Sequence, residues 1–545
     1  MDRELDVCTV LDAIAGDRPD AEAIVHGDRR LSRADVAERT NRLANHLVGR
    51  GLGCRTERST LRGHESGQDH LAIYLHNSVE YLESMLGAWK ARVAPLNVNF
   101  RYVADELRYL LDDARTRAIV VQSCFAPTLA DVLPDVPALD VIIQVPDRSG
   151  NALLPGAEWY DDALRESSSR PAGVERSPDD LYILYTGGTT GMPKGVLWRN
   201  GDAMIECFGG SATATDVAGF VAEANAGPPF RAVIAPPFMH GAGHWVALNV
   251  WLRGGTVFVL PHPEYLDPAE VWHLVERERI DFLLIVGDAF ARPLLDELGR
   301  GTYDASSLNV VMSGGAALSV GSKAEFLRRL PTVMVVDGMG SSEAGGQLAH
   351  VSTGTNASTG TFAARPGNHV LSADLSRVLT PDDDEIGWLA KSGRLALGYL
   401  GDADKTARTY PTVDGVRYAV PGDRARWGAD GTIELHGRDS VTINSGGEKI
   451  FAEEVELAVK AHPDVYDCVV AGRPSERWGS EVVAIVRRRQ GADVTPDALL
   501  TVAADHIARY KLPKRIVFVD EIVRSPSGKA DYRWAREIAA ASAAP

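Results

Sequence analysis

The sequence predicts an α/β protein with largely parallel sheets, followed by a smaller α+β domain toward the C-terminal end. Two patterns indicate this: apolar strand-like runs alternate with helical stretches over most of the chain, and short alternating pieces replace them after residue 418. The length of 545 residues also exceeds the roughly 250 to 300 at which one hydrophobic core stops growing. We therefore expect at least two domains, with a boundary near residues 438–445.

The segment 71–99 shows the first pattern most clearly, because it reads as a buried strand, a helix with apolar spacing and a second short strand. Similar buried strands are predicted at 117–121, 256–260, 281–287 and 310–315, with helical stretches between them. The segments 54–70 and 211–229 are polar and weakly periodic, so we expect loops there.

The second pattern begins with short alternating strands, and the Asp430-Gly431 pair between them is typical of a hairpin turn. Further along, a helix is predicted at 450–462 and a strand at 482–489. These elements suit a compact α+β domain.

The composition indicates a soluble globular protein, with 45% hydrophobic and 24% charged residues. A net charge of −17 disfavours nucleic acid or an anionic membrane surface as a general partner. The first residues do not resemble a secretory signal, and no run reaches the 18 or so apolar residues of a membrane span. We expect no membrane span, a cytoplasmic location and reduced thiols at the scattered cysteines Cys8, Cys54, Cys124, Cys207 and Cys468.

The motif YTGGTTGMPKG at 185–195 directly follows the apolar strand LYILY. Its glycines let backbone N–H groups approach an anion closely, its threonines add hydroxyl donors, and its lysine adds a positive charge. The motif does not fit GxxxxGK[ST], which excludes a kinase-like P-loop. It predicts a phosphate-binding loop made by Thr186, Gly187, Gly188, Thr189, Thr190, Gly191 and Lys194.

Five further motifs follow: PPFMHGAGH at 236–244, SGGAALS at 313–319, DGMGSSEAG at 337–345, PGDRARWGADGTIELHGRDSVTINSGGEK at 421–449 and SPSGKADY at 525–532. In order and spacing, all six motifs together resemble the acyl-CoA synthetase and fatty-acid–CoA ligase family of the adenylate-forming (ANL) superfamily. The resemblance covers most of the chain. The TINSGGEK loop is most similar to bacterial acyl-CoA synthetases for fatty and steroid side-chain acids.

This resemblance implies a large N-terminal domain, residues 1–439, of layered α/β sheets plus a barrel-like β part, and a small mobile α+β C-terminal domain, residues 440–545. It implies that ATP activates a hydrophobic carboxylic acid, long-chain fatty or steroid-derived, as an acyl-adenylate, and that the acyl group then passes to CoA. ATP, Mg²⁺ and CoA are the implied cofactors. A homodimer is one possible oligomeric state.

The resemblance also assigns catalytic roles. Lys529 bridges the acid's carboxylate and the α-phosphate, and preorganised donors of this kind contribute on the order of 10² to 10³ in rate. Glu343, a carboxylate beside hydroxyls, suits Mg²⁺, with Thr189 as the second metal ligand. His240 is preferred over His244 as the histidine that lines the acyl pocket.

Further positions are assigned to the nucleotide and to CoA. Asp423 binds the ribose hydroxyls and Arg438 the ribose or a phosphate, while Gly314, Gly315 and Ala316 lie against adenine. The nucleotide also meets the segment Asp337, Gly338, Met339, Gly340, Ser341 and Ser342. The pantetheine arm of CoA passes Ser445, Gly446, Gly447 and Lys449, and Ser440 is the hinge.

Three positions depart from the family pattern. Met339 stands where an aromatic residue usually stacks on adenine, although methionine can still cover a ring face. Ser342 replaces a common threonine and keeps the hydroxyl. Ser440 replaces the Asp or Lys usual at the pivot, and rotation is still expected because hinges need only absorb a backbone change.

Other functions remain open at this point. A fatty acyl-AMP ligase would load a carrier protein instead of CoA. An amino-acid adenylation domain would place an aspartate early in its acid pocket, for which Asp288 is the candidate. A silent nucleotide-binding homologue need not retain Lys194, Glu343, Asp423, Arg438 and Lys529 together, and luciferase-like oxygenation has no support in the sequence.

Overall fold

The structure is a computed structural model that describes residues 4–188, 191–211, 213–228, 230–358, 360–445, 448–475, 479–525 and 528–542. It contains two compact units. Unit 1 consists of Met1–Leu284, Ser342–Gly346 and Arg394–Tyr410, and unit 2 consists of Ile285–Ser341, Gln347–Gly393 and Pro411–Pro545. The predicted domain boundary at 439/440 falls inside unit 2 and stays a prediction.

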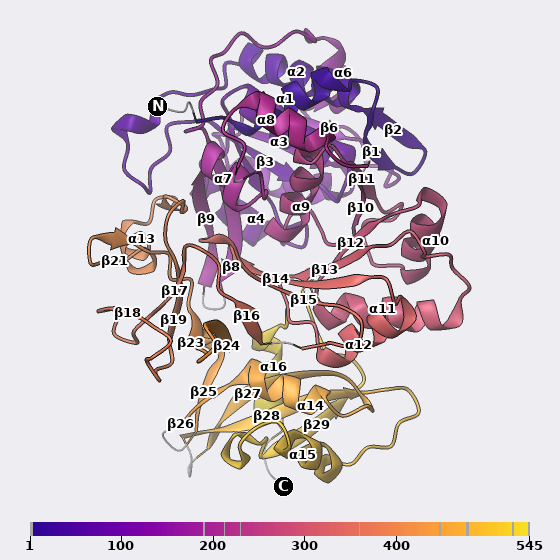
Figure 1. The fold of residues 1–545 in the computed structure, drawn as a ribbon. Coiled ribbons are helices and arrows are strands. Elements are labelled where there is room, and N and C mark those ends of the chain that lie inside the picture. The colour runs from indigo at the N-terminus through magenta and orange to yellow at the C-terminus, as the bar shows by residue number, and fades with distance from the viewer. Residues whose placement is uncertain are drawn as a thin grey trace. The chain divides into compact units, whose positions relative to one another are not determined.

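An eight-stranded sheet of unit 1 has the order β20-β9-β8-β4-β3-β5-β6-β7 (Figure 1). The pairs β7–β6, β6–β5, β5–β3, β3–β4 and β4–β8 are parallel, whereas β9 pairs antiparallel with β8 and β20. Its strands are β3 (His70–Tyr74), β4 (Ala94–Asn97), β5 (Ala118–Gln122), β6 (Val141–Val145), β7 (Glu158–Trp159), β8 (Leu181–Gly188), β9 (Gly191–Arg199) and β20 (Gly398–Tyr399).

A second run of strands in unit 1 has the order β12-β10-β11-β1-β2, all parallel except the β1–β2 hairpin. The predicted strands at 71–99, 117–121, 256–260 and 281–287 are thereby confirmed. The strands are β1 (Glu22–His26), β2 (Arg29–Ser32), β10 (Arg231–Ile234), β11 (Thr256–Val259) and β12 (Phe282–Ile285).

Helices connect these strands because apolar side chains recur on the faces that meet the sheets. Every residue of α3 is buried, as expected for the helix of the predicted strand–helix–strand segment. The helices of unit 1 are α1 (Val7–Asp17), α2 (Arg33–Gly49), η1 (Arg58–Thr60), α3 (Val79–Lys90), α4 (Ala104–Asp113), η2 (Ser123–Phe125), α5 (Ala126–Val132), η3 (Leu133–Asp135), α6 (Tyr160–Arg165), α7 (Asn200–Glu206), α8 (Val217–Asn225), α9 (Gly241–Leu252), α10 (Pro268–Glu278) and α13 (Ala403–Thr409).

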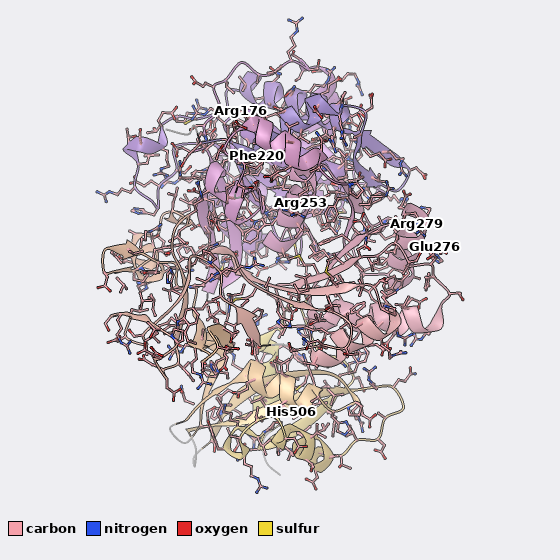
Figure 2. All side chains as sticks on the ribbon, viewed as in Figure 1. Arg176, Phe220, Arg253, Glu276, Arg279 and His506 are labelled. Carbon is pink, nitrogen blue, oxygen red and sulfur yellow. The ribbon has the colours of Figure 1, made fainter. Side chains whose placement is uncertain are left out.

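The prediction of a loop throughout 211–229 is wrong, because α8 forms within it. Asp216 caps the helix by accepting the backbone N–H of Gly219, and Phe220 is buried (Figure 2). Elsewhere in unit 1, Arg176 fixes α1, since its guanidinium lies 2.8 Å from the carboxylate of Asp12 (Figure 2).

Unit 2 contains the parallel pair β13–β14 and a six-stranded antiparallel sheet with the order β16-β24-β23-β19-β17-β18. This sheet is open, with β16 and β18 at its edges, so the expected barrel-like β part stays a prediction. The predicted hairpin at Asp430-Gly431 joins β23 to β24. The strands are β13 (Val310–Gly314), β14 (Met334–Ser341), β15 (Gly345–Ser352), β16 (Thr361–Ala363), β17 (Asn368–Leu371), β18 (Val378–Leu379), β19 (Gly387–Lys391), β21 (Thr412–Val413), β22 (Val416–Arg417), β23 (Asp423–Trp427) and β24 (Thr432–Arg438).

The C-terminal part of unit 2 is a five-stranded sheet with helices on both faces. Val470, Val482 and Ala484 belong to one apolar cluster with residues of α14 and α15, whereas Val469 and Val483 join another with α16. Its elements are β25 (Thr442–Ser445), β26 (Glu448–Phe451), β27 (Val465–Ser475), β28 (Gly479–Arg488), β29 (Arg515–Val519), η4 (Asp439–Val441), η5 (Arg509–Lys511), α14 (Ala452–Lys460), α15 (Pro496–Ala504) and α16 (Tyr532–Ala541); unit 2 also has α11 (Gly287–Arg300) and α12 (Val320–Arg329).

One smaller difference concerns this part. The helix predicted at 450–462 begins later, at Ala452, because Glu448–Phe451 pairs with β25 as strand β26. All five cysteines are free thiols, as predicted. Among the described residues, no helix combines the length and the apolar character needed to cross a membrane.

Candidate active site

The phosphate motif forms the end of a β-hairpin in unit 1 and not the open loop that its composition suggests. β8 and β9 pair so that Thr186 lies opposite Lys194 and Gly188 opposite Gly191. The backbone of the motif therefore follows the sheet almost to its tip. The two tip residues, Thr189 and Thr190, lie outside the described part of the chain.

Acidic and aromatic side chains of α4 hold Lys194. Its Nζ lies 3.3 Å from Oδ1 of Asp113, and Tyr185 donates its hydroxyl to Oδ2 of the same carboxylate at 2.8 Å. Burial alone would lower the pKa of Lys194, but Tyr109 and Asp113 raise it above its usual value. The amine is therefore protonated at neutral pH, as an anion site requires.

Asn97, at the end of β4, connects two of the predicted motifs. Its side-chain NH₂ donates to the carbonyls of Tyr185 at 2.9 Å and Met239 at 2.7 Å, and its Oδ1 accepts the N–H of Tyr185 at 2.8 Å. One buried amide thus joins the phosphate hairpin to the residue that precedes His240. The sequence carried no signal for this role beyond the strand itself.

Glu343 lies in the turn between β14 and β15, as predicted. Trp198 of β9 fixes this turn by donating to the carbonyl of Ser342 at 2.8 Å, and Tyr399 donates its hydroxyl to Oε1 of Glu343 at 2.7 Å. The amine of Lys405 lies 4.0 Å from the ring centroid of Tyr399, and burial lowers its pKa although Glu343 opposes that shift. Sequence reasoning missed both Tyr399 and Lys405.

The surroundings of Glu343 fit Mg²⁺, which is bound in proteins by one or two carboxylates together with substrate phosphates and water. Within the described ranges, no three His, Cys, Asp or Glu side chains gather as a metal site. A single carboxylate oriented by a phenol, with Lys194 and Lys405 in the same unit, suits a metal that arrives with a nucleotide.

The two histidines of the PPFMHGAGH motif differ in burial. His244 is buried, bonded to the Tyr182 hydroxyl and to the carbonyl of Phe238, and burial lowers its pKa to about 4. It is therefore a neutral core histidine. His240 is half-buried at the N-cap of α9, so it is the histidine of the pair that can face a bound molecule.

In unit 2, the structure brings Lys529 to the predicted adenine segment. A Cβ atom built on Gly315 would lie 3.9 Å from Cε of Lys529, and Gly315 has a positive φ of 88°. Lys529 is exposed, and its backbone N–H donates to Oγ of Ser525 at 3.2 Å. Gly314 is buried and Ala316 is half-buried beside it.

Asp423 and Arg438 lie opposite each other on β23 and β24, with Nε of Arg438 3.2 Å from Oδ1 of Asp423. The second oxygen, Oδ2, is buried and has no hydrogen-bond partner among the described residues. Such an oxygen is costly to bury alone, and a ligand hydroxyl would satisfy it. This observation fits the predicted ribose contact.

The DGMGSS segment forms most of β14, and buried residues of unit 2 pack against it. Asp337 is buried and forms an ion pair with the fully buried Lys323, and burial raises the pKa of Asp337. Met339 is partly buried against the apolar core of the six-stranded sheet, and a Cβ on Gly338 would lie 2.8 Å from Cε of Met312. Gly340 is exposed and Ser341 is buried.

The remaining predicted positions are described only in part. Ser445 ends β25, and Ser440 falls in the short helix η4. Gly446 and Gly447 lie outside the described residues. The structure does not describe the side chains of Ser440 and Lys449 or the exposure of Gly187.

The structure does not support Asp288 as the amine-binding residue of an amino-acid pocket. Its Oδ1 accepts three hydrogen bonds from Ser319 and Ser322, and its Oδ2 faces two cations of the chain itself. The carboxylate therefore already has charged partners within the chain, although its Oδ2 accepts no hydrogen bond from the described residues.

Comparison with known families agrees with this geometry. The AMP-binding enzyme family matches residues 11–400, and the AMP-binding enzyme C-terminal domain matches residues 454–529. The chain belongs to the AMP-binding enzyme family. The two matched ranges contain the phosphate hairpin, Glu343 and Lys529.

Several members of this family align with nearly the whole chain. The medium-chain acyl-CoA ligase Mig of Mycobacterium avium is 53% identical over 98% of both chains. The medium/long-chain-fatty-acid–CoA/3-oxocholest-4-en-26-oate–CoA ligase of Mycolicibacterium smegmatis is 40% identical over 95% of this chain and 94% of the relative. The 3-oxocholest-4-en-26-oate–CoA ligase of Rhodococcus rhodochrous is 38% identical over 95% and 93%.

Solved structures of the family share the fold. ATP-bound MatB from Rhodopseudomonas palustris has a TM-score of 0.81 at 25% identity and covers 98% of this chain and 99% of its own. The anthranilate CoA ligase AuaEII, in complex with anthranoyl-AMP, has a TM-score of 0.82 at 18% identity, over 99% and 98%. The mixed α/β fold with a smaller C-terminal domain is therefore that of the adenylate-forming enzymes.

Proposed function

We propose that this protein is an AMP-forming acyl-CoA synthetase that activates medium- to long-chain fatty acids or a steroid side-chain acid. The activities named for the relatives, at 38% to 53% identity along nearly the full length, support the substrate class. They extend the predicted range of acids to medium-chain ones. The observation that carries the chemistry is the position of Lys529 beside Gly315.

The reaction has two steps. A carboxylate oxygen of the acid attacks the α-phosphorus of ATP, a phosphorus–oxygen bond forms, and pyrophosphate leaves. The ammonium group of Lys529 offsets the negative charge that gathers between the carboxylate and the α-phosphate. The thiolate of CoA then attacks the acyl carbon of the mixed anhydride, and AMP leaves.

The other residues bind and orient the substrates. Lys194 attracts the phosphates, and Asp423 accepts the ribose hydroxyls through its buried oxygen. Glu343, with phosphate oxygens, would hold Mg²⁺, which neutralises charge on the leaving pyrophosphate. His240 borders the acyl group. A cytoplasmic location and a homodimer stay predictions.

The proposal is tested with purified protein, MgATP and a panel of acids: short, medium and long fatty acids, aromatic acids and steroid side-chain acids. Pyrophosphate, AMP and acyl-CoA are followed with and without CoA. We expect acyl-CoA from one hydrophobic class. Lys529→Ala should lower pyrophosphate release by about 10² to 10³-fold.

Lys514→Ala, at an exposed lysine of the same unit, is the matched control and should leave the rate unchanged. Pyrophosphate release that never yields acyl-CoA would indicate a carrier protein as the acceptor. Absence of turnover with every acid would contradict the proposed activity.

A further inference from the structure

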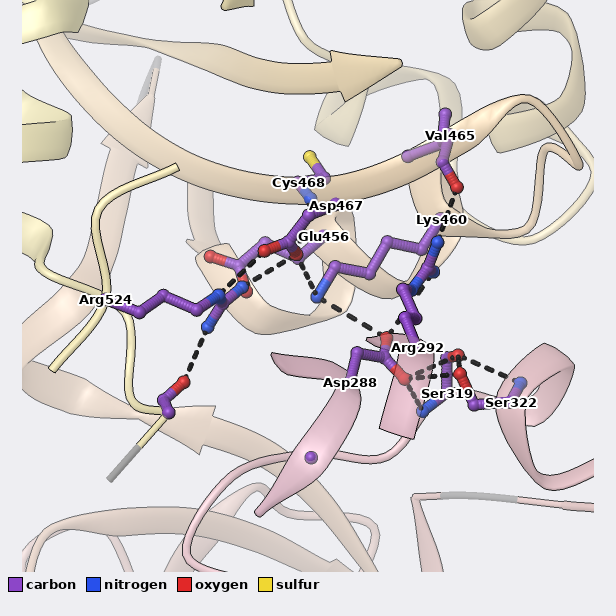
Figure 3. A network of polar contacts seen from close by, with 12 residues as sticks. Asp288, Arg292, Ser319, Ser322, Glu456, Lys460, Val465, Asp467, Cys468 and Arg524 are labelled. Atoms are coloured by element: carbon purple, nitrogen blue, oxygen red, sulfur yellow. Dashed lines mark hydrogen bonds and ion pairs between the residues drawn. The ribbon is translucent and has the colours of Figure 1, made fainter. Parts of the chain in front are cut away.

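Unit 2 contains a buried ionic network that the chemistry proposed above does not use (Figure 3). Its Arg524 donates to the carbonyl of Gly528, the residue before Lys529. The network contains the carboxylates of Asp288 on α11 and Asp467 on β27, together with three cations. The cations are Arg292 of α11, Lys460 at the end of α14 and Arg524 in the segment that leads to Lys529.

Asp288 is almost fully buried, with 4% of its surface exposed. Its Oδ1 accepts the N–H of Ser319 at 3.1 Å, the hydroxyl of Ser319 at 2.9 Å and the hydroxyl of Ser322 at 2.8 Å. Its Oδ2 lies 3.6 Å from Nη2 of Arg292 and 3.8 Å from Nζ of Lys460. The serines therefore fix the carboxylate, and its second oxygen attracts the cations.

At the other end of the network, Arg524 connects Asp467 to the turn that carries Lys529. Its Nε and Nη2 bind the two oxygens of Asp467 at 2.7 and 2.8 Å, and its Nη1 donates to the carbonyl of Gly528 at 3.0 Å. Gly528 immediately precedes Lys529 and has a φ of 70°, and a Cβ there would lie 3.0 Å from the carbonyl of Val286. Arg524 thus holds the backbone next to the catalytic lysine.

Lys460 joins the two ends, because its Nζ lies 3.2 Å from Oδ1 of Asp467 and 3.8 Å from Oδ2 of Asp288. Arg292 adds a second connection by donating to the carbonyl of Val465 at 2.6 Å. These contacts attach α11 and the N-terminal end of α12 to α14, β27 and the segment that carries Lys529. They act across the predicted domain boundary at 439/440.

Each side of that boundary keeps at least one cation for its own carboxylate. Asp288 keeps Arg292 and the serines on its own side, and Asp467 keeps Lys460 and Arg524 on the other. Separating the sides would break the Lys460–Asp288 attraction and the Arg292–Val465 bond without leaving a buried charge alone. An isolated buried charge is what makes most broken ion pairs costly, so this contact is built to open.

We propose that Asp288, Lys460, Asp467 and Arg524 form an ionic latch that positions Lys529 against Gly315 for adenylation and releases it for thioester formation. These are positioning residues, since none is placed in contact with a reacting atom. The inference rests on the proposed function, because it assigns the latch to the first of the two steps.

Measuring the two half-reactions separately distinguishes the latch from a general structural role of these residues. Adenylation is measured as pyrophosphate release without CoA, and thioester formation as acyl-CoA made from supplied acyl-adenylate, both with the acid that the wild type prefers. Asp288→Asn should lower adenylation about tenfold or more and leave thioester formation within about twofold. Lys460→Met should do the same, and Lys460→Arg should restore most of the adenylation rate.

Hydrogen exchange without substrate provides a second measurement. In Asp288→Asn, the amides of β27 and of residues 524–532 should exchange faster than in the wild type, whereas those of the six-stranded sheet should not change. The matched control is Glu325→Gln on α12, which removes a carboxylate paired with Arg328 and Arg329 within its own helix. It should alter neither half-reaction nor exchange.

Equal losses in both half-reactions, or unchanged exchange in β27 and 524–532, would overturn the latch. The double variant Asp288→Asn/Lys460→Met should be no slower than either single variant, and additive losses would also overturn it. If the wild type turns over no acid, the proposed function fails, and the exchange result still decides whether these residues hold the Lys529 segment.

Discussion

Tyr399 orients the one carboxylate that we expect to meet Mg²⁺. Its hydroxyl donates to Oε1 of Glu343 at 2.7 Å, and a hydrogen bond to a charged group contributes about 1.5 to 3 kcal/mol. Tyr399→Phe keeps the ring beneath Lys405 and removes only this donor. We expect kcat/KM for MgATP to fall about tenfold and the Mg²⁺ concentration for half-maximal rate to rise, as measured by pyrophosphate release at varied Mg²⁺.

Tyr410→Phe is the matched control, because the Tyr410 hydroxyl reaches the backbone carbonyl of Glu343 at 3.4 Å and not its carboxylate. Its Mg²⁺ dependence should resemble that of the wild type. An unaltered Mg²⁺ dependence in Tyr399→Phe would show that the Tyr399 hydroxyl has no role at the metal site.

Among elements, β4 supports both the phosphate hairpin and the PPFMHGAGH motif through Asn97. Asn97→Ala would leave buried backbone groups of Tyr185 and Met239 without their partner. We expect the free energy of unfolding to fall by about 2 to 3 kcal/mol, and ATP affinity to fall as the hairpin loosens. Urea denaturation and equilibrium ATP binding measure the two effects.

Asn99→Ala is the comparison, since the Asn99 side chain accepts the N–H of Arg101 at an exposed site two residues further on. It should change stability by less than about 0.5 kcal/mol. Similar losses in both variants would mean that Asn97 has no special role in joining the two motifs.

For the molecule as a whole, Glu453 at the start of α14 makes stability depend on pH. Burial, with the nearby carboxylates of Glu456 and Asp423, raises the pKa of Glu453 to about 7 from about 4.5. The folded state therefore binds a proton that the unfolded state has lost. The stabilising contribution is full below about pH 4.5 and disappears as the pH rises through about 7.

Glu453→Gln is neutral at every pH and should abolish this part of the dependence. We expect the variant to match the wild type at pH 5 and to have the higher melting temperature at pH 8, where the wild type ionises Glu453 at a cost. Thermal unfolding from pH 5 to 8 measures this difference in melting temperature. Glu537→Gln, at an exposed position on α16, is the control. A wild-type advantage at pH 8 would show that the carboxylate gains more from Arg438 than burial costs.

The sequence by itself determined the family and the fold class, and it predicted the chemistry of single positions. A glycine- and threonine-rich loop with a lysine and a strand–helix–strand pattern are local features, because backbone freedom and hydrophobic period depend on neighbours along the chain. The role of Lys529 came only from the resemblance of its motif to the family. The hairpin at Asp430-Gly431, the strands of 71–99 and the turn of Glu343 were predictable for that reason.

Only the tertiary structure decided which groups hold those positions in place. Tyr399 is 56 residues from Glu343, Asn97 is 142 residues from Met239, and Asp288 is 172 residues before its attracting cation Lys460. Residues so far apart in the sequence form no short motif whose spacing could have been recognised. Asp288 suggested a substrate pocket in the sequence, whereas in the fold the nearby Lys460 and Arg292 and the hydrogen bonds from Ser319 and Ser322 lower the pKa of its buried carboxyl group.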